Sequence, residues 1–440
     1  MRSILLARGA ERLEYEIREI VKKAEQVERC GQKIYWENIG DPIQKNAKIP
    51  AWIKDIITKL VQEDKTYGYC HSKGLLQTRK FLAERNNALG GVQITENDIL
   101  FFNGLGDAIS KVYQFLHPST RIIGPSPAYP THSSAEAAHA SMAPLTYKLD
   151  PDNHWYPDLE DLYNKVKYNP NVAGILIINP DNPTGMVYPL ETLQRIVAIA
   201  EEFNLMLISD EIYNNITYNG ARAYALAEVI GAVPGIAMKG ISKEVPWPGA
   251  RAGWMEFYNR DKDKDFTRLC EILEDVKMTE VCSTTLPQYA IPLILSDPAY
   301  APYRKERNEA IGKRSKIITD ILGNVPMIKF NETYGAFYNS IVFKDGVFKE
   351  GQRLHTDNPA IQALLDQWFE GKNYAPDKRF AYYLLATEGV CVVPLSSFHS
   401  DLLGFRVTLL EEDEELLRIT FEKIKKAVID YCTSVAEVAQ

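Results

Sequence analysis

The stretch GISKEVPWPGARAGW, Gly240–Trp254, decides how the rest of the chain is interpreted. A short apolar run at 236–238 predicts a strand that leads into Ser242 and Lys243, and Arg251 follows in a turn rich in proline and glycine. A strand, a lysine and then an arginine on a tight loop can present an amine beside a bound phosphate, and a nearby cation with partial burial favours the nucleophilic, deprotonated amine. Most lysines are solvated surface charges, so other stretches have to supply the remaining parts of such a site.

The composition bounds the class of protein. With 440 residues, 45% hydrophobic and 25% charged, the chain is typical of a soluble globular protein with two domains. A net charge of −8 argues against nucleic acid as a partner. No apolar run is long enough to span a membrane, and the start lacks a signal-peptide pattern. Six cysteines without a CxxC pair or a nearby histidine cluster predict reduced thiols, a cytoplasmic location and no metal site.

Polar or glycine-rich motifs follow a series of predicted strands. The strand Ile99–Asn103 leads through Gly104, Leu105, Gly106 and Asp107 into a helix, whose unpaired N-terminal amides favour an anion. This pattern is weak alone, because an ordinary tight turn gives it too. A second strand ends before PSPAYP, 125–130, where two prolines fix the backbone around Tyr129. Its ring is placed to stack on a flat ligand, with packing in the core as the alternative.

Two further strands end in polar motifs. Gly174–Ile178 stops at NPDNPTG, a loop so stiffened by proline that it would hold Asn182 in one orientation for a ligand oxygen. After a helix, Leu205–Ser209 ends at Asp210 and, three residues on, Tyr213. Strand–helix–strand units with polar groups at their carboxyl ends predict an open, mostly parallel α/β sheet that binds its ligand at that edge.

The C-terminal part mixes strands and longer helices, which indicates a smaller α+β domain. We expect a large domain at 48–310 and a small domain made of 1–47 with 311–440. Segment 344–379 is polar and irregular apart from one helix, and it predicts a surface insertion. Apolar spacing predicts a helix over Glu11–Arg29, which carries Arg18, most simply a solvated charge.

These groups match what a pyridine-aldehyde cofactor with a phosphate tail requires. Lys243 would form the Schiff base and then move the substrate's α-proton, while Asp210 would keep the ring nitrogen protonated. A planar guanidinium fits a carboxylate bidentately, so Arg406, on a predicted strand, is the candidate for holding the substrate. The cofactor also needs donors to its ring hydroxyl, which Asn182 and Tyr213 offer, and a stacking ring, which Tyr129 offers. The amides of Gly106 and Asp107, with Arg251, offer the anion site.

NPDNPTG, SDEIY, GISK followed by PGARAGW, and PSPAYP together resemble the class I/II aminotransferases of the pyridoxal-phosphate fold-type I superfamily. The motifs run from NIGDP at 38–42 to FRVTLLEEDEEL at 405–416, nearly the whole chain. The resemblance implies pyridoxal 5'-phosphate as cofactor, amino acids and 2-oxo acids as substrates, and a homodimer with shared active sites. It also implies that Tyr69 donates to the phosphate in the neighbouring subunit, that Gly40 lies by the substrate carboxylate, and that Ser242 and Arg251 hold the phosphate of their own subunit.

One departure from the family concerns Gly240, which stands where many members have the first serine of SxSK and removes one hydroxyl from the expected phosphate site. GxSK also occurs in a bacterial branch that resembles glutamate–pyruvate aminotransferases. That branch shares YEIR near the start, GYCHSKGL at 68–75 and WYPDLEDL at 155–162 with this chain. We therefore expect alanine/pyruvate and glutamate/2-oxoglutarate as substrates, with Arg18 or a nearby polar group meeting the second carboxylate of glutamate.

Several alternatives stay open. Carbon–sulfur lyases and aminocyclopropane-type enzymes share the first carbanion with aminotransferases, so they use nearly the same residues. Specificity for aspartate or aromatic substrates is equally compatible with the motifs. A non-catalytic ligand sensor, such as the aminotransferase-like module of certain transcription regulators, needs a DNA-binding segment ahead of the module. About forty residues before the first core motif are too few for one.

Overall fold

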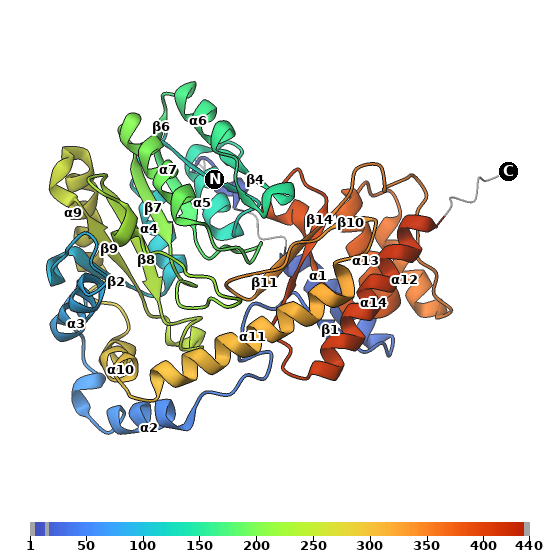
Figure 1. Cartoon of the computed structure of the whole chain (residues 1–440), viewed down its shortest axis with the longest axis horizontal. Helices are drawn as coiled ribbons and strands as arrows, with labels where there is room; N and C mark the ends of the chain where they lie inside the picture. The colour runs from blue at the N-terminus through green and yellow to red at the C-terminus, as the bar shows by residue number, and fades with distance from the viewer. Residues whose placement is uncertain (1–4, 14–16, 435–440) are drawn as a thin grey trace.

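The computed structural model of the chain describes residues 5–13 and 17–434, with the side chains of Ile17 and Arg18 excepted. Figure 1 shows a large lobe around an eight-stranded sheet and a small lobe around a four-stranded sheet. The long helix α11 (Tyr300–Leu322) runs along both lobes and joins them. No helix within the described residues is long and apolar enough to cross a membrane.

The large sheet has the strand order β2-β9-β8-β7-β6-β3-β4-β5. The pairs from β8 to β4 are parallel, whereas β9 and β5 run antiparallel to their neighbours. Inner strands such as β6, β7 and β9 are almost entirely buried, as expected where helices cover both faces. The strands are β2 (Ile99–Phe102), β3 (Arg121–Ser126), β4 (Thr146–Asp150), β5 (Tyr156–Pro157), β6 (Val172–Ile178), β7 (Met206–Asp210), β8 (Gly235–Gly240) and β9 (Gly253–Tyr258).

Helices on both faces of this sheet bury its two apolar surfaces in separate clusters. One face is covered by α4 (Leu105–Gln114), α5 (Pro130–Ala140) and α9 (Lys264–Thr279). The other is covered by α2 (Ala51–Leu60), α3 (Leu76–Asn87), α6 (Leu159–Lys167), α7 (Leu190–Glu202), α8 (Leu226–Val229) and α10 (Thr285–Leu295). Because the parallel strands share one carboxyl edge, the loops after β3, β6, β7 and β8 emerge side by side and face the small lobe.

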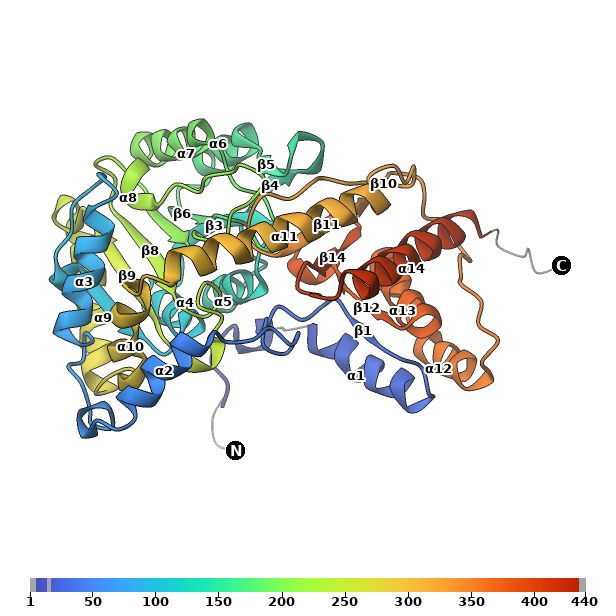
Figure 2. The same ribbon diagram turned by 60° about the horizontal axis from the view of Figure 1, so that its bottom comes forward.

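The small lobe combines both ends of the chain. Its antiparallel sheet has the order β10-β11-β14-β13, and a separate parallel pair joins β1 to β12. Figure 2 shows α1, from the N-terminal segment, beside helices near the C-terminus. The elements are α1 (Ile17–Arg29), β1 (Tyr35–Trp36), β10 (Ile328–Lys329), β11 (Tyr338–Phe343), α12 (Pro359–Phe369), α13 (Pro376–Glu388), β12 (Val390–Cys391), β13 (Val393–Pro394), β14 (Gly404–Thr408) and α14 (Glu414–Thr433).

Short 3₁₀ helices punctuate the loops. They are η1 (Ala10–Arg12), η2 (Asp64–Thr66), η3 (Glu96–Asp98), η4 (Pro151–Asn153), η5 (Pro248–Ala250), η6 (Arg260–Lys262) and η7 (Leu395–Phe398).

Two sequence-based predictions about the elements are wrong in detail. The single helix expected from Glu11 is a 3₁₀ turn followed by α1 from Ile17, and Leu13 is 65% exposed instead of lying on a buried face. The irregular segment ends at residue 375, because α13 begins at Pro376. Asp377 is completely buried there, where it accepts hydrogen bonds from the backbone amides of Ser396 and Gly404. The expected domain boundary at 310/311 falls inside α11, and the boundaries stay predictions.

Candidate active site

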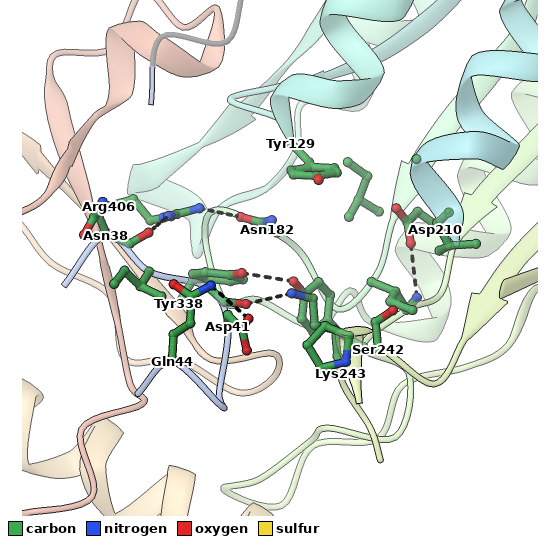
Figure 3. Close-up of a pocket in the computed structure, with 18 of the residues that line it drawn as sticks. Asn38, Asp41, Gln44, Tyr129, Asn182, Asp210, Ser242, Lys243, Tyr338 and Arg406 are labelled. Atoms are coloured by element: carbon green, nitrogen blue, oxygen red, sulfur yellow. Dashed lines mark hydrogen bonds between the residues drawn. The ribbon is translucent and has the colours of Figure 1, made fainter. Parts of the chain in front are cut away.

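A cavity of about 530 Å³ lies where the carboxyl edge of the large sheet meets the small lobe. Figure 3 shows side chains from both lobes pointing into it. Its wall contains most of the residues predicted from the sequence, namely Gly40, Leu105, Gly106, Tyr129, Asn182, Asp210, Tyr213, Ser242, Lys243, Arg251 and Arg406. It also contains Asn38, Asp41, Gln44 and Tyr338, which the sequence analysis did not single out.

Lys243 projects into this cavity from the loop after β8. Its Nζ donates a hydrogen bond to the backbone oxygen of Gly40 at 2.7 Å and lies 5.7 Å from the centre of the Phe337 ring. Gly40 belongs to the N-terminal segment, so the amine of the large lobe faces the wall supplied by the small lobe. The partly buried amine can therefore contact a small molecule held between the lobes.

Asp210 is the last residue of β7, and it is 3% exposed. One carboxylate oxygen accepts a hydrogen bond from the Ile212 amide at 3.1 Å, and the other lies 3.0 Å from His132 Nε2. His132 comes from the first turn of α5 and is 1% exposed. Sequence reasoning missed this histidine, since no spacing rule connects it to a strand end nearly eighty residues later.

The start of α4 forms an anion-binding corner. Its N-cap, Gly104, supplies no side-chain hydrogen bond, so the first amides of the helix are available to a ligand. Arg251 lies across this start, and its guanidinium donates to Pro248 O at 3.0 Å and Asn103 O at 3.3 Å. Gly104 has a φ of +84°, and a Cβ there would lie 2.3 Å from Arg251 Nη2. Glycine is therefore required for the guanidinium to approach the helix start, beside Ser242.

Arg406 faces the cavity from β14 and is 3% exposed. Its guanidinium donates to Asn38 O at 2.7 Å and to Asn182 Oδ1 at 3.3 Å, and it lies over the ring of Tyr338 at 4.5 Å. Its Nε is buried without a hydrogen-bond partner among the described residues. A buried guanidinium donor without an acceptor is costly unless a ligand supplies one, and a carboxylate is the geometric match.

Tyr213 and Tyr338 meet between these groups. Their hydroxyls are 3.1 Å apart, and both rings are buried. Burial raises the pKa of Tyr213 well above its usual value, and the neighbouring Tyr338 adds to that effect. Tyr213 therefore stays neutral and can donate a hydrogen bond. The only signal for Tyr338 in the sequence was its place in a predicted strand, where an aromatic residue is ordinarily part of the core.

The family model described as aminotransferase class I and II matches residues 37–433. The chain belongs to the class I and II aminotransferases. It is 52% identical over 431 residues to an uncharacterised aminotransferase of Methanocaldococcus jannaschii, covering 98% of this chain and 99% of that protein. A glutamate–pyruvate aminotransferase of Escherichia coli is 34% identical over 285 residues, covering 64% of this chain and 68% of that protein.

Solved aminotransferase structures share the fold. An alanine aminotransferase of Pyrococcus furiosus superimposes with a TM-score of 0.83 at 27% identity, covering 96% of this chain and 99% of that one. An aminotransferase of Escherichia coli gives a TM-score of 0.84 at 26% identity, covering 98% and 100%. The predicted fold class, fold-type I with a mostly parallel sheet and a smaller α+β part, is confirmed.

Class I and II aminotransferases depend on pyridoxal phosphate, and the residues of this aminotransferase fit that group. The uncapped start of α4 and Arg251 match its phosphate, and the buried carboxylate of Asp210 matches a protonated ring nitrogen. The amine of Lys243 lies in the same cavity. The unpartnered Nε of Arg406 matches the carboxylate of an amino acid.

Among the described residues, two predicted site residues, Asp107 and Tyr69, do not line the cavity of this aminotransferase. The carboxylate of Asp107 accepts a hydrogen bond from the Asn103 amide at 3.0 Å and lies 3.6 Å from Lys277 Nζ, so it closes the turn before α4. Tyr69 is 86% exposed, away from the cavity of its own chain. The side chain of Arg18 lies outside the described residues. The roles expected for Tyr69 and Arg18 stay predictions.

Proposed function

We propose that this aminotransferase exchanges an amino group between the alanine/pyruvate and glutamate/2-oxoglutarate pairs in two half-reactions. The observation that carries the reaction type is one cavity holding a lysine amine, a buried carboxylate and a buried arginine with an unpartnered donor. The substrate pair is supported by similarity to proteins named glutamate–pyruvate and alanine aminotransferase.

Each of the main cavity residues has a separate role in the proposed reaction. The cofactor, when bound, supplies the carbonyl that takes up the amino group and a ring that stabilises negative charge at the substrate α-carbon. Lys243 is the base that takes the α-proton and later returns a proton as the acid. Asp210, oriented by the Ile212 amide and His132, stabilises the positive charge of the ring nitrogen. Arg406 holds the substrate carboxylate through Nε and the adjacent terminal nitrogen.

The other cavity residues hold the cofactor. Asn182 and Tyr213 donate to its ring hydroxyl, and Tyr129 packs against the ring. The amides of Leu105 and Gly106, with Ser242 and Arg251, bind the phosphate. Because Asn182 and Asp210 are each 3% exposed, water is largely excluded from the polar contacts, which strengthens them.

We infer that the protein is a homodimer in which Tyr69 donates to the phosphate of the neighbouring subunit. The exposed side chains of Tyr69 and Tyr67, 86% and 74%, support this, since large exposed aromatic rings are enriched at interfaces. Mixing Tyr69→Ala and Lys243→Ala subunits tests it, because each mixed dimer contains one site with both residues intact. We expect activity to appear in the mixture above that of either variant alone. A mixture no more active than the variants measured separately would contradict a shared site.

Two finer proposals concern glutamate and the compartment. We propose that Arg18 meets the second carboxylate of glutamate, so that Arg18→Ala raises KM for glutamate and not for alanine. Normal kinetics with both substrates would refute this.

The six cysteines are all free thiols, which supports a reducing compartment such as the cytoplasm.

Product analysis tests the reaction type. Incubation with L-alanine and 2-oxoglutarate should give pyruvate and glutamate in equal amounts without free ammonia. Ammonia with no glutamate would indicate a lyase. No product with any amino acid, despite tight ligand binding, would indicate a sensor.

A further inference from the structure

A buried ion pair links the two ends of the N-terminal segment that forms one wall of the cavity. Glu37 and Lys45 flank residues 38–44, and this segment supplies Asn38, Gly40, Asp41 and Gln44 to the wall. Lys45 Nζ donates to Glu37 Oε1 at 3.2 Å and to the backbone oxygen of Trp36 at 3.0 Å. It also lies 3.5 Å from Glu411 Oε2. The side chains of Glu37 and Lys45 are 1% and 7% exposed, so the pair is out of water.

The same segment is attached to β14, the strand that carries Arg406. Arg406 and Thr408 are two residues apart and therefore lie on the same face of the strand. Arg406 donates to Asn38 O at 2.7 Å, and the Thr408 hydroxyl donates to Glu37 Oε2 at 2.9 Å. The first residues of the segment are thus held at two successive positions of one strand, while Lys45 holds its far end.

Burial of these charged groups costs desolvation free energy. Burial raises the pKa of Glu37, and Lys45 and the Thr408 hydroxyl oppose that rise by stabilising the ionised carboxylate. Buried ion pairs of this kind contribute little net stability compared with apolar residues, because desolvation offsets the attraction. Their directional contacts instead fix a geometry. The geometry fixed here is that of Gly40 and Asn38, whose backbone oxygens accept from Lys243 and Arg406.

We propose that Glu37, Lys45 and Glu411 form an ionic clasp that positions segment 38–44 for substrate binding. Lys45 is then a positioning residue, which acts through Asn38 and Gly40 on Arg406 and Lys243. The proposal rests on the proposed function only in that the substrate carboxylate binds Arg406. The phosphate corner, at the start of α4 and Arg251, belongs to the large lobe, and within the described residues the guanidinium of Arg251 donates to Pro248 O and Asn103 O, which are not part of the clasp. Loss of the clasp should therefore weaken amino-acid binding and leave cofactor binding intact.

The central variant is Lys45→Met, which keeps an unbranched side chain one atom shorter than lysine and removes its charge. Lys48→Met is the matched control, because Lys48 lies three residues on and is exposed. Lys45→Arg restores the charge. We expect Lys45→Met to raise KM for the amino acid by about tenfold with kcat changed less than about threefold, while Lys48→Met leaves both unchanged and Lys45→Arg recovers most of the loss.

Binding can be measured without turnover. The compound 2-methylalanine has the amino and carboxylate groups of a substrate but no α-hydrogen, so it binds the holoenzyme without reacting further. Its dissociation constant, from the absorbance change of the bound cofactor, should rise about as much as KM in Lys45→Met. The dissociation constant of pyridoxal phosphate should stay within about twofold of the wild-type value.

An unchanged dissociation constant for 2-methylalanine, with a lowered melting temperature, would overturn the proposal and leave the clasp a purely structural feature. If Lys45→Met does not fold, Glu411→Gln tests the same idea, because Glu411 is partly exposed and its removal leaves Glu37 paired. We then expect a smaller rise, about threefold, and no rise would refute the proposal. Should wild-type enzyme not use alanine, the proposed substrate fails. The clasp is then tested with whichever amino acid the wild type does use.

Discussion

Replacing Arg406 by lysine should cost this aminotransferase most of its affinity for the reacting substrate. Two guanidinium nitrogens contact Asn38 O at 2.7 Å and Asn182 Oδ1 at 3.3 Å, and the buried Nε has no hydrogen-bond partner in the described part of the chain. A lysine nitrogen cannot keep both contacts and also bind a carboxylate in two places. Loss of one charge-assisted hydrogen bond, worth about 1.5–3 kcal/mol, lowers kcat/KM roughly 10- to 150-fold.

The assay is steady-state kcat/KM for the amino-acid substrate, with cofactor absorbance as a check that the site is loaded. Arg314→Lys is the matched control, because this largely buried guanidinium on α11 donates to Leu409 O at 3.0 Å away from the cavity. The control should stay within about threefold of wild type. If Arg406→Lys also stayed within that range while folded and loaded, the carboxylate would bind elsewhere and the assignment of Arg406 would be wrong.

Three further predictions concern neighbouring groups. Burial raises the pKa of Asp181 to about 7, well above its value in the unfolded chain. The folded state therefore favours the protonated carboxyl, and the free energy of unfolding falls as the pH rises from the unfolded pKa to the folded one. Between pH 5 and 8, the free energy of unfolding of the wild type, measured with urea, should fall by about 2–3 kcal/mol relative to that of Asp181→Asn. The same pH dependence of this free energy in both proteins would refute the prediction. A Cβ on Gly40 would lie 2.2 Å from the Tyr338 hydroxyl, so Gly40→Ala should raise KM, and adding Tyr338→Phe should partly restore it. If the double variant has the same KM as Gly40→Ala, the added methyl group does not clash with the Tyr338 hydroxyl. Tyr338→Phe alone should lower the free energy of unfolding by about 1 kcal/mol, measured by urea unfolding, because Tyr213 loses its hydroxyl partner.

Sequence alone located the groups that follow strands of the large sheet. Asn182, Asp210 and Lys243 each come shortly after a buried apolar run, and parallel strands bring such positions to one edge. Arg406 could be chosen because a planar guanidinium fits a carboxylate bidentately and this arginine lies on a predicted strand. These placements follow from local pattern and one general property of parallel sheets.

Contacts between elements could not be found in this way. His132 reaches Asp210 because α5 packs against β3 and its first turn lies near the end of β7, and Tyr338 reaches Tyr213 because β11 contributes to the cavity wall. Both depend on packing between segments distant in the sequence. The prediction for the motif at 104–107 concerned its backbone amides, and the pattern assigned no role to the carboxylate of Asp107, which accepts a hydrogen bond from the Asn103 amide. A polar residue at a helix start is ambiguous between binding a ligand and closing the turn until the turn is seen.

The most direct test of the central claim is a single-turnover experiment on the holoenzyme with L-alanine and no acceptor. We predict that the visible absorbance band of the bound cofactor is replaced by one at shorter wavelength, with one pyruvate released per subunit. Lys243→Ala should show neither change on the same timescale. Pyruvate formation by Lys243→Ala at a rate close to that of wild type, or a wild-type spectrum that no amino acid alters, would contradict the account.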